Sequence, residues 1–289
     1  MALPEKVTLP SLLEKKNSGR KITMLTAYDY AIASLVDQAG IDLVLVGDSV
    51  GMVALGYSST VSVTMDEMLH HCKAVRRAVS RALVVGDMPF MSFNCSREQT
   101  IRNAGRFLQE AGCDAVKVEG GQGSDDSEAA VRAIAGAGIP VLGHLGLTPQ
   151  TAARVGGFKL QAKDAQAADQ LLSAALRLEK AGCFGLVLEC VPAPVAAEVT
   201  RRLKIPTIGI GAGSGCDGQV LVINDLLGLK GDFHPRFARP FAQLDRTIIK
   251  AVQQFRAEVE KGTFPSDRES YAMDPKQLAL WKKKWSKKK

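Results

Sequence analysis

The sequence predicts an α/β protein folded as a (β/α)8 TIM barrel, and three observations lead to this prediction. Eight short apolar runs rich in Val, Leu and Ile lie between residues 21 and 225, as is typical of strands buried on both faces. Helical patterns separate most of them. Acidic or histidine side chains end five of the runs. An open doubly wound sheet gathers its ligands at one switch point, so groups spread over five strands favour a closed barrel.

Each expected strand is a run of five to eight mostly apolar residues, too short for an ordinary helix. We expect strands at residues 21–28, 42–48, 82–87, 115–119, 140–144, 185–189, 206–213 and 219–225. Helix starts carry acidic or capping residues, such as Asp66 and Glu67 after Thr64, and Ser96 three residues before Gln99, the spacing of a capping box. We expect helices at residues 31–40, 64–79, 96–111, 125–137, 164–181, 194–203 and 241–261.

The alternation of strands and helices stops near Gly228, and a long loop occupies residues 145–163. We expect a single barrel domain with an N-terminal arm over residues 1–265, followed by an extended, lysine-rich tail over residues 266–289. The formal net charge of +7 is located in that tail, because residues 276–289 carry seven lysines and no acidic residue. The rest of the chain is therefore near neutral, which argues against a nucleic-acid-binding face.

The sequence lacks the features of a membrane or secreted protein. The sequence has no apolar stretch of transmembrane length, and its first twenty residues have no apolar signal segment. The six cysteines show no C-x-x-C spacing, so we expect free thiols in a reducing compartment. We expect a cytoplasmic protein with a small-molecule substrate and with neither a membrane nor a nucleic-acid partner.

Three carboxylates stand at the ends of consecutive expected strands: Asp48, Asp87 and Glu119. Parallel strands would bring them to one rim, where barrel enzymes keep their chemistry. Mg²⁺ commonly takes one or two carboxylates and completes its shell with water and substrate. The alternative is that each acid caps a helix or pairs with a lysine. The shared rim favours a metal site.

Three further side chains are candidates for the same rim. Lys117 lies two residues before Glu119 and thus on the same face of its strand; it could hold a substrate carboxylate, neutralise Glu119 or form a Schiff base. His144 could be a ligand, a proton shuttle, a hydrogen-bond donor or a structural residue. Glu189 ends a more distant strand, where a general base would face the metal across the barrel.

The glycine-rich stretch at residues 209–213, GIGAG, is a weaker signal. Its spacing is not that of a dinucleotide-binding loop. The glycines allow either a close approach of substrate or tight packing of the strand.

Taken together, these segments resemble the ketopantoate hydroxymethyltransferase family. The resemblance rests on TAYDY, VGDSVGM, DMPFMS, VKVEGG, GHLGLTPQ, LVLECVP and GIGAG followed by DGQVLV, which lie in this order between residues 26 and 222. It implies a barrel of the class related to phosphoenolpyruvate mutase and isocitrate lyase. It also implies a one-carbon transferase of pantothenate and coenzyme A biosynthesis that uses Mg²⁺ and assembles as a homo-oligomer, a decamer. The reaction would transfer a hydroxymethyl group from 5,10-methylenetetrahydrofolate to 3-methyl-2-oxobutanoate, giving 2-dehydropantoate.

The resemblance also implies roles for the rim residues. Asp48, Asp87 and Glu119 match the metal-site carboxylates, and the oxoacid would be bound by Asp48, Ser49, Asp87 and Lys117. The sequence departs from the family's pattern at residues 56–64, GYSSTVSVT, and in the lysine- and tryptophan-containing ending beyond residue 274.

Glu189 matches the family's proton acceptor, and His144 matches a supporting active-site histidine. In the implied mechanism Mg²⁺ polarises the keto group, Glu189 removes the C3 proton, and the enolate attacks the one-carbon unit.

Two other functions are weighed against this one. A Mg²⁺-dependent oxoacid lyase or mutase of the related class would typically carry a catalytic cysteine in a mobile loop, and residues 145–164 contain no cysteine. An inert barrel whose tail binds a membrane or nucleic acid would have no need of an intact set of rim acids.

Overall fold

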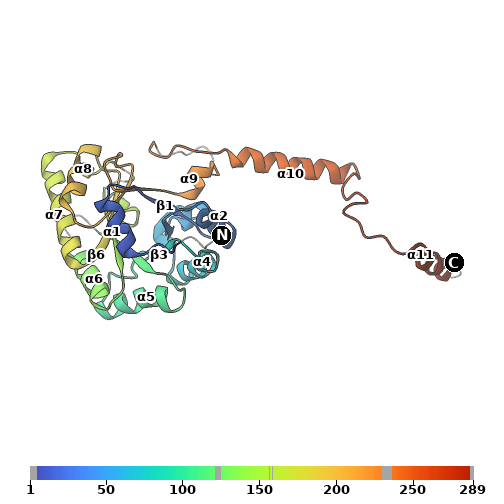
Figure 1. Cartoon of the computed structure of the whole chain (residues 1–289), viewed down its shortest axis with the longest axis horizontal. Coiled ribbons are helices and arrows are strands. Elements are labelled where there is room, and N and C mark those ends of the chain that lie inside the picture. The colour runs from blue at the N-terminus through green and yellow to red at the C-terminus, as the bar shows by residue number, and fades with distance from the viewer. Residues whose placement is uncertain (1–4, 121–124, 156, 158, 230–235, 287–289) are drawn as a thin grey trace. The chain divides into compact units, whose positions relative to one another are not determined.

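Eight parallel strands close into a barrel in the computed structural model, which describes residues 5–120, 125–155, 157, 159–229 and 236–286 (Figure 1). The strands are β1 (Ile22–Thr26), β2 (Leu43–Val46), β3 (Leu83–Asp87), β4 (Ala115–Glu119), β5 (Val141–Gly146), β6 (Cys183–Glu189), β7 (Thr207–Ile210) and β8 (Gly218–Leu221). Their order round the barrel is their order in the chain, and Ile22 of β1 pairs with Gly218 of β8. The predicted closed barrel is confirmed, and the open sheet is excluded.

Helices surround the barrel and cover its floor. They are α1 (Leu9–Asn17), α2 (Tyr30–Gln38), α3 (Val50–Val53), α4 (Met65–Ala78), α5 (Arg97–Gln109), α6 (Asp125–Gly136), α7 (Ala165–Ala181), α8 (Ala193–Arg202) and α9 (Ile223–Leu227), with 3₁₀ turns η1 (Thr60–Ser62) and η2 (Pro149–Val155). The predicted helices within this range are all present. Helix α1, the short helices α3 and α9 and both 3₁₀ turns are not among the predicted elements.

The caps of two helices differ from the predicted pattern. A full capping box starts α4, where Thr64 and Glu67 exchange both contacts. At α5 the Ser96 hydroxyl accepts from the Gln99 N–H at 3.2 Å, but the structure shows no return contact from the Gln99 side chain. The capping box predicted there is therefore only half formed.

The period of two along each strand decides what points into the barrel. Leu83 and Val85 of β3 belong to the apolar cluster inside the barrel, so Asp87, two residues further, points to the same side. The outer faces of the strands pack against the helices in a second apolar cluster. At Gly86 this packing is so close that a Cβ atom would lie 2.3 Å from the Phe107 ring, so only glycine fits.

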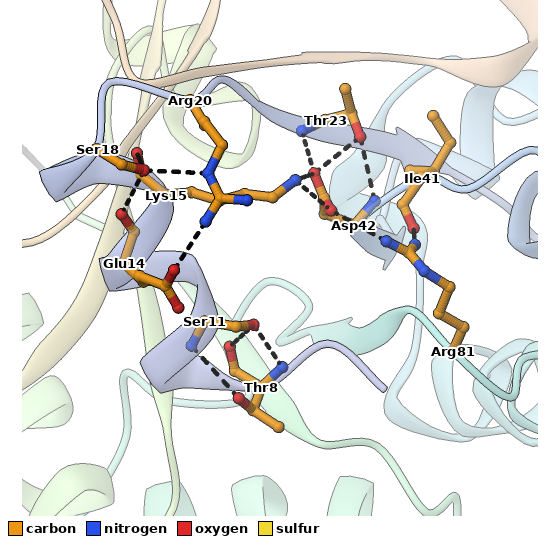
Figure 2. A network of polar contacts seen from close by, with 10 residues as sticks. All are labelled: Thr8, Ser11, Glu14, Lys15, Ser18, Arg20, Thr23, Ile41, Asp42 and Arg81. Carbon is orange, nitrogen blue, oxygen red and sulfur yellow. Dashed lines mark hydrogen bonds and ion pairs between the residues drawn. The ribbon is translucent and has the colours of Figure 1, made fainter. Parts of the chain in front are cut away.

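The N-terminal arm closes the end of the barrel opposite the strand exits. Val7 and Leu12 are buried and join the apolar cluster inside the barrel. Lys15 of α1 lies 2.7 Å from both carboxylate oxygens of Asp42, whose side chain is 1% exposed (Figure 2). The Thr23 N–H and hydroxyl donate to the same carboxylate at 2.9 and 3.0 Å.

The same contact recurs at three strands. An aspartate stands immediately before β2, before β4 and before β8. In each case its carboxylate accepts a backbone N–H of the preceding strand at 2.9 Å. The three donor–acceptor pairs are Thr23 and Asp42, Val84 and Asp114, and Thr207 and Asp217. Each aspartate also pairs with a lysine of the arm: Lys15 with Asp42 at 2.7 Å, Lys6 with Asp114 at 3.1 Å, and Lys16 with Asp217 at 2.7 Å. Three ion pairs therefore fix the arm to the barrel floor.

Residues Ala242–Lys289 form a second compact unit, separate from Met1–Phe241. The first unit thus ends at Phe241, whereas the barrel domain expected from the sequence extends to residue 265. The second unit contains α10 (Leu244–Glu260), which has no buried residue, and α11 (Pro275–Ser286).

Helix α11 lies where an extended tail is expected. Leu, Ala and Lys favour helices, and the Asp274 carboxylate accepts the N–H groups of Lys276 and Gln277 at 3.0 and 3.1 Å. The region of the chain that the structure describes contains no helix long and apolar enough to cross a membrane.

We predict that Lys15→Met lowers the free energy of unfolding at pH 7 by about 2–3 kcal/mol, because it removes the nearer of the two cations that pair with the buried Asp42 carboxylate. The Arg81 guanidinium, 3.5 Å from Asp42 Oδ1, stays in place. Burial raises the pKa of Asp42, but Lys15 and Thr23 outweigh it, so the pKa lies below its usual value. A lowered folded pKa stabilises above about pH 4, and this stabilisation is lost as pH falls through the folded pKa. The variant should therefore lose less stability in acid than the wild type. Urea unfolding at pH 7 and in acid measures both effects.

The matched control is Arg20→Met, which removes an ion pair to Glu14 with 59% and 70% exposed side chains. It should change the free energy of unfolding by less than about 1 kcal/mol. Equal effects of the two substitutions would contradict the prediction that the ion pair between Lys15 and Asp42 stabilises the fold more than an exposed ion pair does.

Candidate active site

A cavity of about 950 Å³ opens at the carboxyl ends of the strands. All the predicted site residues line it: Asp48, Ser49, Asp87, Lys117, Glu119, His144 and Glu189. The sequence prediction of one shared rim is therefore matched by the position of these side chains in a single cavity.

Strand register sets the first ion pair. Asp87 of β3 and Lys117 of β4 are register partners, and the Lys117 ammonium lies 2.7 Å from Asp87 Oδ1. The other Asp87 oxygen accepts the backbone N–H of Asp48 at 3.1 Å. Asp87 thus bridges the loop after β2 and the interior of β4. Because the ammonium is directed at carboxylates, the geometry favours the two roles in which Lys117 stays charged, pairing with a site acid or holding the substrate carboxylate, over a Schiff base.

The next register pair connects the acids to Glu189. Glu119 of β4 and His144 of β5 are register partners, and His144 Nδ1 lies 3.6 Å from Glu119 Oε1. The other ring nitrogen, Nε2, lies 3.2 Å from Glu189 Oε2. The imidazole, which is 3% exposed, therefore stands between two carboxylates.

Burial and mutual repulsion shape the charges of this cluster. Burial, then Asp87 and Glu119, raise the pKa of Asp48 well above its usual value. Burial also raises the pKa of Asp87, although Lys117 opposes it. For Glu119, Lys117 and His144 outweigh burial, so its pKa is lowered. Burial and mutual repulsion therefore disfavour the charged forms of Asp48 and Asp87, whereas Lys117 and His144 favour the charged form of Glu119.

The two basic groups respond in the opposite sense. Burial lowers the pKa of Lys117, but Asp87, Glu119 and Asp48 together raise it above its usual value. Burial and Lys117 lower the pKa of His144, whereas its contacts with Glu119 and Glu189 raise it to about 9. The neighbouring carboxylates therefore raise the pKa of both groups, and Lys117 Nζ lies 3.4 Å from His144 Nδ1.

The donor set fits a hard divalent cation. Three carboxylates share this rim, and Asp87 Oδ1 and Glu119 Oε1 are buried without an oriented hydrogen bond, although Lys117 lies 2.7 and 3.7 Å from them. Among the described residues no three His, Cys, Asp or Glu side chains converge into a direct ligand set. The site therefore suits Mg²⁺, which needs only one or two direct carboxylates and takes water and substrate for the rest.

Two residues beside the acids are absent from the sequence predictions. The Tyr28 hydroxyl lies 2.9 Å from Ser49 Oγ, and burial raises the pKa of Tyr28. Gln150, in η2, contacts both Asp48 and Glu119. Tyr28 lies in the motif TAYDY and Gln150 in the motif GHLGLTPQ, so the resemblance to the family includes both positions. A tyrosine or a glutamine does not by itself indicate a catalytic or binding role.

The glycine-rich stretch at residues 209–213 overlaps the end of β7, and its last glycine allows close packing. A Cβ atom on Gly213 would lie 2.4 Å from Ala193 Cβ, and Gly211 has a φ of 63° that favours glycine. Both glycines also line the cavity. Met52, Val53 and Phe237 also line the cavity, and they are not anticipated from the sequence.

Solved structures share this fold. A phosphonopyruvate hydrolase in complex with oxalate and Mg²⁺ has a TM-score of 0.58 at 12% identity, covering 98% of this chain and 97% of that one. A phosphoenolpyruvate phosphomutase from Streptomyces platensis subsp. rosaceus has a TM-score of 0.59 at 16% identity, covering 97% of both chains. A 2,3-dimethylmalate lyase of the PEP mutase/isocitrate lyase superfamily has a TM-score of 0.58 at 13% identity, covering 96% and 93%. The predicted fold class is confirmed.

Sequence relatives are much closer. The 3-methyl-2-oxobutanoate hydroxymethyltransferase of Syntrophomonas wolfei is 54% identical over 93% of this chain and 96% of its own length. That of Syntrophus aciditrophicus is 55% identical over 92% and 97%. The family profile of ketopantoate hydroxymethyltransferase matches residues 6–267. The chain therefore belongs to the ketopantoate hydroxymethyltransferase family.

Proposed function

We propose that this chain transfers a hydroxymethyl group from 5,10-methylenetetrahydrofolate to 3-methyl-2-oxobutanoate and so forms 2-dehydropantoate. The observation that carries the proposal is the convergence in one cavity of three carboxylates, a buried lysine and, across His144, Glu189. The cavity of about 950 Å³ has room for a small oxoacid together with the ring system of a folate. Formation of 2-dehydropantoate from the two substrates and Mg²⁺ tests the proposal directly.

Mg²⁺ would be held by Asp48 and Asp87, with Glu119 holding it through water, and when bound it would supply Lewis-acid stabilisation of charge on the keto oxygen. Lys117, 4% exposed among these acids, supplies a fixed positive charge for the oxoacid carboxylate. Ser49, whose hydroxyl lies 2.9 Å from that of Tyr28, offers a further hydrogen-bonding group to the oxoacid in the same cavity. These residues together orient the substrate before any proton moves.

Glu189 is the proposed proton acceptor. Its side chain is 14% exposed and lines the cavity, and His144 Nε2 lies 3.2 Å from Glu189 Oε2, within ion-pair distance. The Glu189 carboxylate takes the proton from C3 of the oxoacid. The role of His144 is thus to support Glu189.

The alternative oxoacid lyase or mutase is less well supported. The cysteine that lines the cavity, Cys190, follows Glu189 directly, and burial, then Glu189, raise the pKa of its thiol to about 12. A thiol with this pKa is a poor acid or base at neutral pH. The six cysteines are free thiols, in keeping with the proposed cytoplasmic location.

We propose a homo-oligomer, a decamer by family resemblance, and α10 offers an assembly surface. Ile248, Val252, Phe255 and Val259 recur at helical spacing along one face of α10 and are 50%, 61%, 55% and 47% exposed. An isolated helix of this length is marginal in water, so it needs an apolar partner. A second copy of the chain would supply one.

We predict that Asp87→Asn lowers turnover by about two orders of magnitude or more while the fold stays intact. The substitution removes one of the three acids and the partner of Lys117, so it should weaken Mg²⁺ binding. Steady-state rates at several Mg²⁺ concentrations measure the effect. Asp66→Asn, at an 84% exposed side chain of α4, is the control and should behave as wild type. Wild-type rates and Mg²⁺ dependence for Asp87→Asn would contradict the metal assignment.

Removal of the C3 proton of the oxoacid needs no folate, so the step assigned to Glu189 can be measured without the one-carbon donor. In deuterated water with Mg²⁺ and the oxoacid alone, the wild type should exchange this proton. Glu189→Gln keeps the shape but loses the basicity, so exchange should fall at least about a hundredfold. Nuclear magnetic resonance of the C3 position follows it. If the variant exchanged at the wild-type rate, Glu189 would not be the base, and His144 would be tested next.

For the assembly surface, we predict that Phe255→Asp reduces the oligomeric mass, because a charge in an apolar contact is costly. Light scattering after size exclusion measures the mass. Gln253→Asp, on the same helix away from the apolar face, is the control and should leave the mass unchanged. An unchanged mass for both variants would exclude α10 from the interface.

A further inference from the structure

The segment at residues 147–150 crosses the rim of the cavity after β5. At its start, the Leu147 N–H donates to the Glu189 carbonyl at 2.8 Å. At its end stands Gln150, which is 5% exposed. The segment thus runs from a contact with β6, which carries the proposed base, to the side of the barrel that carries the acids.

Gln150 makes three donor contacts with three other parts of the rim. Its side-chain amide nitrogen lies 2.9 Å from Asp48 Oδ2 and 2.9 Å from the Met88 carbonyl oxygen. Its backbone N–H donates to Glu119 Oε2 at 3.1 Å. One buried residue therefore contacts two of the three proposed cation-binding carboxylates and the strand exit that follows the third.

The orientation of the amide follows from its partners. A carboxylate and a carbonyl oxygen carry no hydrogen, so the Gln150 nitrogen, with its two hydrogens, must face both. A flipped amide would place its oxygen against two acceptors. The side chain is thus fixed, and it fixes in turn one oxygen of Asp48.

The contacts also suit a cation site electrostatically. Neutral donors hold Asp48 and Glu119 in place without removing the negative charge that attracts a divalent ion, whereas a second lysine there would compete with that ion. The repulsion among the three acids would otherwise favour their separation.

We propose that Gln150 is a positioning residue that holds Asp48 and Glu119 in the arrangement that binds the divalent cation. The proposal rests on the proposed function for the use of that cation. It predicts that Gln150 affects cation binding itself, before any substrate is present.

The test measures Mn²⁺ binding to the full chain without oxoacid, by the electron paramagnetic resonance signal of free Mn²⁺. Gln150→Met and Gln150→Leu remove the side-chain donor to Asp48 and to the Met88 carbonyl, and they leave the backbone N–H to Glu119 in place. Both introduce an apolar side chain of similar size, so the test stands on whichever variant folds. Loss of a hydrogen bond to a charged group should weaken Mn²⁺ binding about tenfold or more. Gln161→Leu is the control, because the Gln161 side chain donates to the Lys159 carbonyl and not to the acids; its Mn²⁺ affinity should stay within about twofold of wild type.

Thermal unfolding of each variant separates positioning from general support. Weaker Mn²⁺ binding with cooperative, near-wild-type unfolding supports the proposal. Unchanged Mn²⁺ binding in the Gln150 variants overturns it and leaves the proposed function standing. Loss of binding together with loss of cooperative unfolding also overturns it, because the role would then be structural. Absence of Mn²⁺ binding in the wild type would instead refute the cation site of the proposed function.

Discussion

The pairing register of β3, β4 and β5 is the constraint on which the active site depends. It sets Asp87 opposite Lys117 and Glu119 opposite His144. Because side chains alternate along a strand, a shift of β4 by one residue would turn both Lys117 and Glu119 out of the barrel. The closed barrel excludes such a shift, since every strand is held on both sides. Backbone pairing thus fixes the positions of the charged side chains of the site.

The two ends of the barrel divide stability from function. At the rim, buried carboxylates repel one another, and such sites reduce stability. At the floor, each aspartate before β2, β4 and β8 has both a backbone donor and a lysine partner. The ion pairs at the floor therefore offset the unfavourable repulsion between the carboxylates of the rim, which the site needs in order to bind a cation and an anionic substrate. This separation is typical of barrel enzymes.

Sequence reasoning reaches the strand-borne part of the site and little beyond it. Asp87, Lys117, Glu119 and Glu189 lie on strands whose apolar pattern reveals both position and direction. Asp48 follows its strand closely enough to be included. The structure supplies the other contributions.

Gln150 lies in a loop whose path depends on contacts with three other strand exits, and no local pattern encodes those contacts. The arm lysines and α11 were missed for related reasons. Lysines before a barrel look like surface charge, and a lysine-rich ending looks extended until a cap such as Asp274 is considered.

The pairing of β1 with β8 has a consequence for how the chain folds. Lys16 and Asp217 are 201 residues apart in the sequence, and the closing strand pair spans a similar separation. During synthesis the arm and β1 leave the ribosome first, yet their last partners are made near the end. One edge of the growing sheet must therefore wait unpaired, a state prone to association with other chains. Long-range closure of this kind slows folding, so barrel completion should be the late step in the biogenesis of this protein.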